Sequence, residues 1–161
     1  MSELWVVNAS PIITLAKVNQ LGLLEKLSAS FLVPDAVAAE ILAGEASDPA
    51  LLAIKSGWGQ RASPVSIPQA VLEWGLGSGE SAVLSLALTR GQATVVLDDA
   101  SARSAARTLK LPLIGTLGII VRAKMRRIIP SAGKVIADLR AAGLFLDPQL
   151  VESVLGQIDE A

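Results

Sequence analysis

Two adjacent carboxylates, Asp98 and Asp99, are the residues of this sequence whose type and position indicate chemistry most directly. They follow Thr94–Leu97, a short apolar run typical of a buried strand in a parallel sheet, and precede a helix predicted over 100–110. Ligands of open α/β sheets bind just beyond the carboxyl ends of such strands. Neighbouring carboxylates repel each other unless a cation or a proton lies between them. A helix N-cap explains one of the two residues and leaves the other unexplained, so we expect a functional role.

The residue types that are missing narrow this chemistry further. The 161 residues include no His, Cys or Tyr, which excludes a Ser-His-Asp triad, a thiolate nucleophile, an imidazole base and a Cys/His zinc site. A catalytic site in this chain must therefore use carboxylates, Lys, Arg, hydroxyls or a metal ion. Carboxylate oxygens prefer hard cations, which indicates Mg²⁺ or Mn²⁺ as the cofactor.

Apolar runs alternate with helix signals and predict the elements that must position these carboxylates. Strands are predicted at Leu4–Val7, Phe31–Val33, Thr94–Leu97 and Leu111–Ile114, with another short strand near Val65. Helices are predicted after Ser10 (N-cap) and Pro11, over 21–27, 36–43 and 48–55, after Gly79, and over 100–110, 117–124, 130–142 and 147–158. Strands that alternate with helices imply a single α/β domain over residues 1–161 with a mainly parallel sheet.

In this layout we expect oxygen-bearing side chains to converge on one edge of the sheet. Those that follow strands, or lie on helices able to lean over that edge, are Asn8, Asp98, Asp99, Thr116, Glu40 and Glu80. Together they offer enough ligands for one or two hydrated Mg²⁺ ions. Such clusters serve phosphodiester cleavage, in which one metal generates hydroxide from water and the other stabilises the leaving oxygen. Glu80 also has a purely structural explanation, because an acid in the first turn complements the helix dipole.

Five short motifs, in order and at sensible spacing, resemble the PIN-domain family of metal-dependent nucleases. They are Asn8-Ala9-Ser10-Pro11-Ile12-Ile13, Pro34-Asp35-Ala36-Val37-Ala38-Ala39-Glu40-Ile41, Gly79-Glu80-Ser81-Ala82-Val83, Asp98-Asp99-Ala100-Ser101-Ala102-Arg103 and Gly115-Thr116-Leu117-Gly118. The pattern resembles that of an uncharacterised prokaryotic subfamily and covers roughly residues 4–142. It is similar to the toxin subunits of toxin–antitoxin pairs, which cut RNA. The resemblance implies a three-layer α/β/α sandwich, usually dimeric, with an antitoxin protein as a possible partner and Glu40, Glu80, Asp98 and Asp99 as the catalytic, metal-binding acids.

The first motif departs from the family pattern. Asn8 stands where the family has an Asp, and an uncharged amide ligand attracts a divalent cation less strongly. In addition, Thr116 stands where many members carry a fourth metal-site acid. Two hypotheses follow: a ribonuclease whose activity Asn8 weakens, or a catalytically degenerate module that binds nucleic acid or a partner. A phosphorylation-regulated receiver domain fits poorly, because the acidic pair comes late and no Asp stands between it and Thr116.

Basic residues gather between Arg103 and Arg140, although the net charge of the chain is only −1. Arg103 and Arg107 are four apart on one helix and so share a face near the acidic pair. We expect these residues to contact the phosphates of RNA or another nucleic acid. The residues predicted to bind nucleic acid are Ser10, Arg103, Arg107, Thr116, Arg122, Arg126 and Arg127.

Hydropathy and the start of the chain bear on location and association. The most apolar stretch, Leu111–Val121, is shorter than the roughly 20 residues needed to span a bilayer, and Met1-Ser2-Glu3-Leu4 lacks the basic region of a signal peptide. We therefore expect a cytoplasmic protein with no membrane partner. The segments Leu113–Val121 and Leu144–Leu155 are apolar and poor in charge, which predicts a surface that a homodimer or an antitoxin-like chain would cover.

Overall fold

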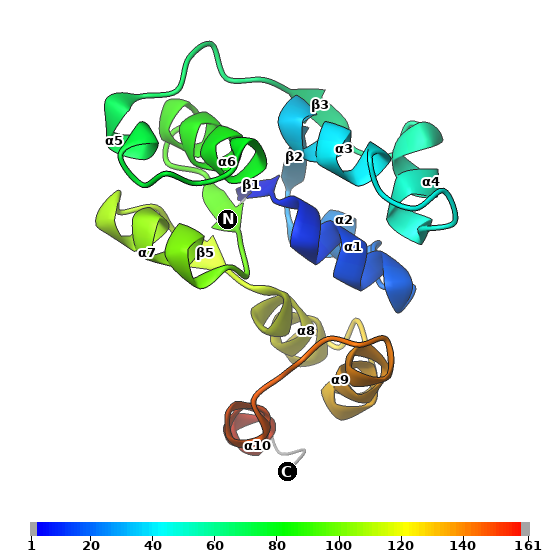
Figure 1. Cartoon of the computed structure of the whole chain (residues 1–161). Coiled ribbons are helices and arrows are strands. Elements are labelled where there is room, and N and C mark those ends of the chain that lie inside the picture. The colour runs from blue at the N-terminus through cyan, green and yellow to red at the C-terminus, as the bar shows by residue number, and fades with distance from the viewer. Residues whose placement is uncertain (1–2, 159–161) are drawn as a thin grey trace.

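The computed structural model describes residues 3–158, so the predicted domain of residues 1–161 extends beyond the described residues at both ends. Five parallel strands form one sheet in the order β3-β2-β1-β4-β5, with helices packed around it (Figure 1). The strands are β1 (Leu4–Val7), β2 (Ser30–Pro34), β3 (Gln60–Ala62), β4 (Thr94–Val96) and β5 (Leu113–Ile114). This arrangement confirms the predicted α/β class and three-layer architecture.

Ten helices connect and cover the strands of the described residues. They are α1 (Ala9–Lys17), α2 (Leu23–Leu27), α3 (Asp35–Leu42), α4 (Pro49–Lys55), α5 (Gln69–Leu72), α6 (Ser78–Thr89), α7 (Ala100–Thr108), α8 (Thr116–Met125), α9 (Ala132–Ala141) and α10 (Pro148–Gln157). Within residues 3–158, none of these helices combines the length and apolar character that a membrane crossing needs.

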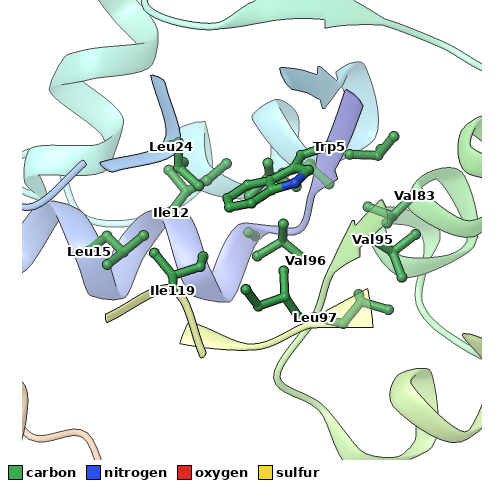
Figure 2. Packing of buried hydrophobic residues seen from close by; sticks show 14 of the residues in the cluster. Trp5, Ile12, Leu15, Leu24, Val83, Val95, Val96, Leu97 and Ile119 are labelled. Carbon is green, nitrogen blue, oxygen red and sulfur yellow. The ribbon is translucent and has the colours of Figure 1, made fainter. Parts of the chain in front are cut away.

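The core lies on both sides of the central strands β1 and β4. Figure 2 shows Trp5 of β1 among side chains from α1, β4 and α8, including Ile12, Val96 and Ile119. These four residues are fully buried, and burying one large apolar side chain contributes about 1.5–3 kcal/mol. The register pairs Val6 with Val95, so the carboxyl ends of β1 and β4 lie side by side.

The strand order reverses direction at β1. From β1 the chain builds outward through β2 to β3, and then returns to the other side of β1 with β4 and β5. Open α/β sheets bind ligands in the crevice beyond the strand ends at such a reversal. The loops that follow β1 and β4, which carry Asn8 and the Asp98–Asp99 pair, therefore flank the place where a ligand is expected.

Three sequence-based expectations about the elements are wrong. The short strand is β3 rather than a segment near Val65, which is fully exposed. β3 is an edge strand that pairs only with β2, and two of its three residues, Gln60 and Arg61, are polar and exposed, so no apolar run marks it. The predicted set of helices also lacks the single-turn helix α5. Helix α1 begins at Ala9, so its N-cap is Asn8 and not Ser10.

Candidate metal centre

A cavity of about 450 Å³ lies beyond the carboxyl ends of β1 and β4. Its lining comprises Asn8, Ser10, Glu40, Gly77, Glu80, Asp98 and Asp99. The structure thus brings together all five predicted metal ligands and one predicted nucleic-acid contact, Ser10. Within residues 3–158 no three acidic side chains already stand in a cation-binding arrangement. Since Glu40 and Asp99 are exposed and mutually repelling carboxylates spread apart, a cation would have to draw them inward.

Asn8 supplies the most specific indication of a ligand at this cavity. Its backbone N–H donates to the Val96 carbonyl over 3.1 Å, which fixes it at the junction of β1 and β4. Its side chain forms no cap bond to α1 although it occupies the N-cap position. Pro11, the third helical residue, has no N–H, so one of the two backbone donors that a cap side chain normally uses is missing.

The side-chain oxygen of Asn8 is consequently without a partner. Asn8 is only 6% exposed, and its Oδ1 accepts no hydrogen bond from any described residue. Leaving such an acceptor buried and unpaired costs roughly 1–3 kcal/mol. A cation in the cavity would satisfy this oxygen, which is the ligand type that Mg²⁺ and Mn²⁺ accept beside carboxylates.

Glu40 reaches the same position from α3. A Cβ atom on Gly79 would lie 3.2 Å from Glu40 Oε1 and 3.6 Å from Asn8 Oδ1. Both oxygens therefore approach the first turn of α6, at a point where a Cβ atom would crowd the Glu40 carboxylate. The sequence motif Gly79-Glu80 is thus explained by two different needs, space at Gly79 and a carboxylate at Glu80.

Glu80 is the residue of the acidic cluster whose pKa is raised. Burial raises the pKa of its carboxyl group above 4.5, and the negative charges of Asp99 and Glu40 raise it further. A hydrogen bond from the backbone N–H of Gly77 opposes this rise. Gly77 was not singled out from the sequence, because nothing in its residue type reveals which backbone amide a carboxylate will meet. A bound cation would relieve the repulsion that Glu80 feels.

Asp98 and Asp99 are held in different ways. Asp99 is the N-cap of α7, and its Oδ2 accepts from the Ala102 N–H over 3.0 Å, so the capping explanation applies to it. Asp98 instead binds Thr116 through both carboxylate oxygens. The charge of Asp99 acts on Glu80, which places Asp99 among the carboxylates that surround the cavity.

The predicted nucleic-acid contacts divide into two groups. Arg103, whose Nη1 donates to the Leu97 carbonyl over 2.9 Å, lies beside Asp98, and the exposed Arg107 lies one helical turn further along α7. Arg122, in contrast, forms an ion pair with Glu3 at 3.2 Å, at the amino end of β1. The structure does not bring Arg122 to the acidic cavity.

The last two predicted basic contacts lie beyond Arg122 on the same helix. Arg126 Nη1 donates to the Leu27 carbonyl over 3.3 Å, near the amino end of β2, and Arg127 follows the last turn of α8. These residues stand at the end of the sheet opposite the cavity, because α8 begins at the cavity edge and runs away from it. A continuous basic track from Arg103 to Arg127 is therefore not observed.

Comparison with known proteins agrees with this geometry. The sequence model of the family DUF3368, described as a PIN domain, matches residues 4–160. No curated protein matches the chain.

Proposed function

We propose that this chain, which belongs to the PIN-domain family, is a Mg²⁺- or Mn²⁺-dependent ribonuclease that hydrolyses phosphodiester bonds. The observation that carries the proposal is the unpartnered, buried Asn8 Oδ1 at a cavity lined by four carboxylates. A buried amide oxygen that accepts no hydrogen bond, together with neighbouring carboxylates, is the set of ligands that a hard cation prefers.

The residues that would hold the cation are the oxygen ligands of the cavity, namely Asn8, Glu40, Glu80, Asp98 and Asp99. A divalent cation bound there supplies Lewis-acid chemistry, which activates water and neutralises charge on the leaving oxygen. The chain's own contribution is to collect and orient these oxygens.

Substrate binding is assigned to residues at the rim of the cavity. Ser10 is exposed and lines the cavity, so its hydroxyl group can donate to a phosphate oxygen. Arg103, which is bonded to the Leu97 carbonyl beside Asp98, and Arg107, one turn further along α7, are the basic residues that we assign to phosphate contacts. This set favours contacts to the phosphate backbone over contacts to bases, so we expect limited sequence specificity.

The second candidate function is a degenerate module that binds nucleic acid or a protein partner without cleavage. Asn8 favours it, because an amide contributes no charge to the attraction of a divalent cation. The two candidates differ in one measurable respect: a weak nuclease gains activity when Asn8 is replaced by Asp, whereas a binding module gains none.

The biological role that we propose is that of a cytoplasmic toxin subunit held by an antitoxin protein, and we further propose a homodimer. The support for association is an apolar groove of about 720 Å³ between α8 and α10, where Phe145 is 84% exposed and Leu150 51% exposed. Light scattering of the wild-type chain and of Phe145→Ser across a concentration series tests the dimer. A wild-type monomer at every concentration would contradict it.

Nuclease activity is tested with the full chain freed of metal by EDTA. Labelled single-stranded and hairpin RNAs, and DNA of the same sequences, are incubated with Mn²⁺, with Mg²⁺ or without metal. We expect slow RNA cleavage that requires the cation and disappears in Glu80→Gln and Asp99→Asn. Arg90→Ala, which changes an exposed residue at the end of α6, serves as the control. If wild type and Asn8→Asp both leave every RNA intact with Mn²⁺, the nuclease proposal fails.

A further inference from the structure

The carboxylate of Asp98 is held by a single residue through both of its oxygens. The backbone N–H of Thr116 donates to Asp98 Oδ1 over 2.8 Å, and the Thr116 hydroxyl donates to Oδ2 over 2.6 Å. Thr116 is 2% exposed and Asp98 is half-buried, so this pair of hydrogen bonds is partly shielded from water. Asp98 follows β4 and Thr116 follows β5, and the two strands are parallel neighbours. The contact therefore ties together the carboxyl ends of two strands at the cavity wall.

The surroundings of this contact are built to accommodate it. Gly115 precedes Thr116, and a Cβ atom there would lie 3.0 Å from Asp98 Oδ1 and 2.8 Å from Arg103 Nη1. Any other residue at position 115 would push against both groups. Arg103 fixes the Leu97 carbonyl, which belongs to the peptide group immediately before Asp98. Backbone and side chain of Asp98 are thus restrained from two directions.

The two Thr116 donors engage both oxygens of the Asp98 carboxylate and leave part of its acceptor capacity open. Both groups of Thr116 donate, and each carboxylate oxygen of Asp98 accepts one of the two bonds. The amide of Thr116 is also the first of the ten-residue helix α8, whose positive end stabilises a negative charge. An ionised carboxylate offers about four lone-pair sites, so about two remain for a ligand in the cavity.

Asp99 provides the contrast. Its Oδ2 accepts one hydrogen bond, from the Ala102 N–H of its own helix, and the residue is exposed. Of the two neighbouring acids, Asp98 is therefore the fixed one and Asp99 the one free to adjust. A fixed oxygen ligand lowers the ordering cost of binding a cation, because fewer rotamers are lost.

We propose that Thr116 is a positioning residue that fixes the Asp98 carboxylate for cation binding through its N–H and hydroxyl donors. This inference rests on the proposed metal-dependent function. It replaces the expectation that the Thr116 hydroxyl contacts nucleic acid, since that hydroxyl already binds Asp98 within a buried site. Partners of this kind behind a metal ligand change metal affinity by about 10–100-fold when they are removed.

The test measures Mn²⁺ binding to the EDTA-treated full chain by isothermal titration calorimetry and by the loss of the electron paramagnetic resonance signal of free Mn²⁺. Thr116→Val removes one donor and keeps the shape, and we expect its Mn²⁺ affinity to fall about tenfold. Thr116→Ser retains the hydroxyl group and should bind within about twofold of wild type. In the Asp98→Asn background, Thr116→Val should cause no further loss, because the carboxylate that it positions is gone.

Thr94 provides a matched control. It is 4% exposed, and its hydroxyl donates to Glu3 Oε2 over 3.0 Å at the other end of the sheet. Thr94→Val therefore removes an equivalent buried hydroxyl–carboxylate bond and should leave the Mn²⁺ affinity unchanged. If Thr116→Val does not fold, Gly115→Ala disturbs the same contact from its other side and should weaken Mn²⁺ binding in the same direction.

The outcomes separate the inference from the function on which it rests. Wild-type affinity in Thr116→Val, or additive losses with Asp98→Asn, would overturn the positioning role while metal binding stands. A wild-type chain that binds no Mn²⁺ would overturn the proposed metal-dependent function, and the positioning role with it.

Discussion

Replacing Asn8 by Asp should strengthen the cation site and weaken the metal-free protein at the same time. The new carboxylate would occupy a position that is 6% exposed, where the present Oδ1 has no hydrogen-bond donor among the described residues. Glu40 Oε1 approaches the same point beside Gly79. At about 6 Å and an effective dielectric constant near 20, one such like-charged pair costs roughly 3 kcal/mol.

A divalent cation reverses the sign of this effect, because it turns repelling carboxylates into ligands. We expect Asn8→Asp to bind Mn²⁺ at least about tenfold more tightly, which corresponds to roughly 1.4 kcal/mol. With Mn²⁺ well above the Kd, that gain appears as additional stabilisation of the folded state. For a chain of this size it is about 3–5 °C of extra rise in Tm on addition of Mn²⁺.

The assay is thermal unfolding with EDTA and with Mn²⁺, followed by RNA cleavage under the same conditions. Asn19→Asp is the matched control, since Asn19 is exposed after α1 and the substitution adds the same charge outside the cavity. The reasoning is refuted if Asn8→Asp has an unchanged Tm in EDTA, or if Mn²⁺ raises its Tm no more than that of wild type.

Further substitutions test the remaining features of the cavity. Because the pKa of Glu80 is raised in the folded state, its contribution to stability is present below about pH 4.5 and is lost as the pH rises through the folded-state pKa. Glu80→Gln should therefore raise the Tm of the metal-free protein at pH 7 but not at pH 4. Gly79→Ala should lower the Tm and the Mn²⁺ affinity by displacing Glu40. Gly77→Ala is the control and should change the Tm little, because nothing lies within 4 Å of its Cβ position. Equal effects of the two substitutions would contradict the inference that Gly79 makes room for Glu40. Asp99→Asn preserves a good N-cap and removes charge, so it should weaken Mn²⁺ binding with little loss of stability. Asp99→Ala also removes the cap, so it should lower the free energy of unfolding by about 1 kcal/mol more than Asp99→Asn does.

Most of the architecture was predictable because each signal is local. The runs Leu4–Val7 and Thr94–Leu97 are apolar and flanked by helix starts, which is how a buried parallel strand appears in a sequence. Asp48 before Pro49 correctly predicted the start of α4, where its side chain accepts from the Ala50 N–H. The edge strand β3 was misplaced, because what makes it a strand is pairing with β2 and not its own residues.

The start of α1 shows a different limit of sequence reasoning. Ser10 followed by Pro11 is a regular helix start, yet the helix begins at Ala9 and includes both residues. Pro11 tolerates this position because the N–H groups of the first turn have no partner within the helix. The earlier start places Asn8 at the N-cap with its side chain turned to the cavity, which a local rule cannot foresee.

Candidate ligands were easier to identify than the geometry that separates their roles. Asp98 and Asp99 are equivalent in the sequence, but one is bound by Thr116 from the neighbouring strand and the other caps its own helix. Likewise Arg103 and Arg122 are both basic residues near apolar segments, but Arg103 is bonded to the Leu97 carbonyl beside Asp98, whereas Arg122 pairs with Glu3 at the amino end of β1. These distinctions depend on which end of the sheet a residue occupies, and charge patterns along the chain carry no such information.

The sequence motifs around the cavity combine the proposed metal ligands with residues that leave those ligands unpaired, give them space or hold them by hydrogen bonds. The pairs are Asn8 with Pro11, Glu40 with Gly79, and Asp98 with Thr116. In each pair the second residue has no ligand role: it removes a competing donor, vacates space or supplies donors. A cluster of like charges is unfavourable without a cation, so a stable fold must restrain the carboxylates through contacts that persist in the metal-free state. This requirement explains why the motifs extend beyond the acids, and why transferring the acids alone to another α/β sheet would not reproduce the site.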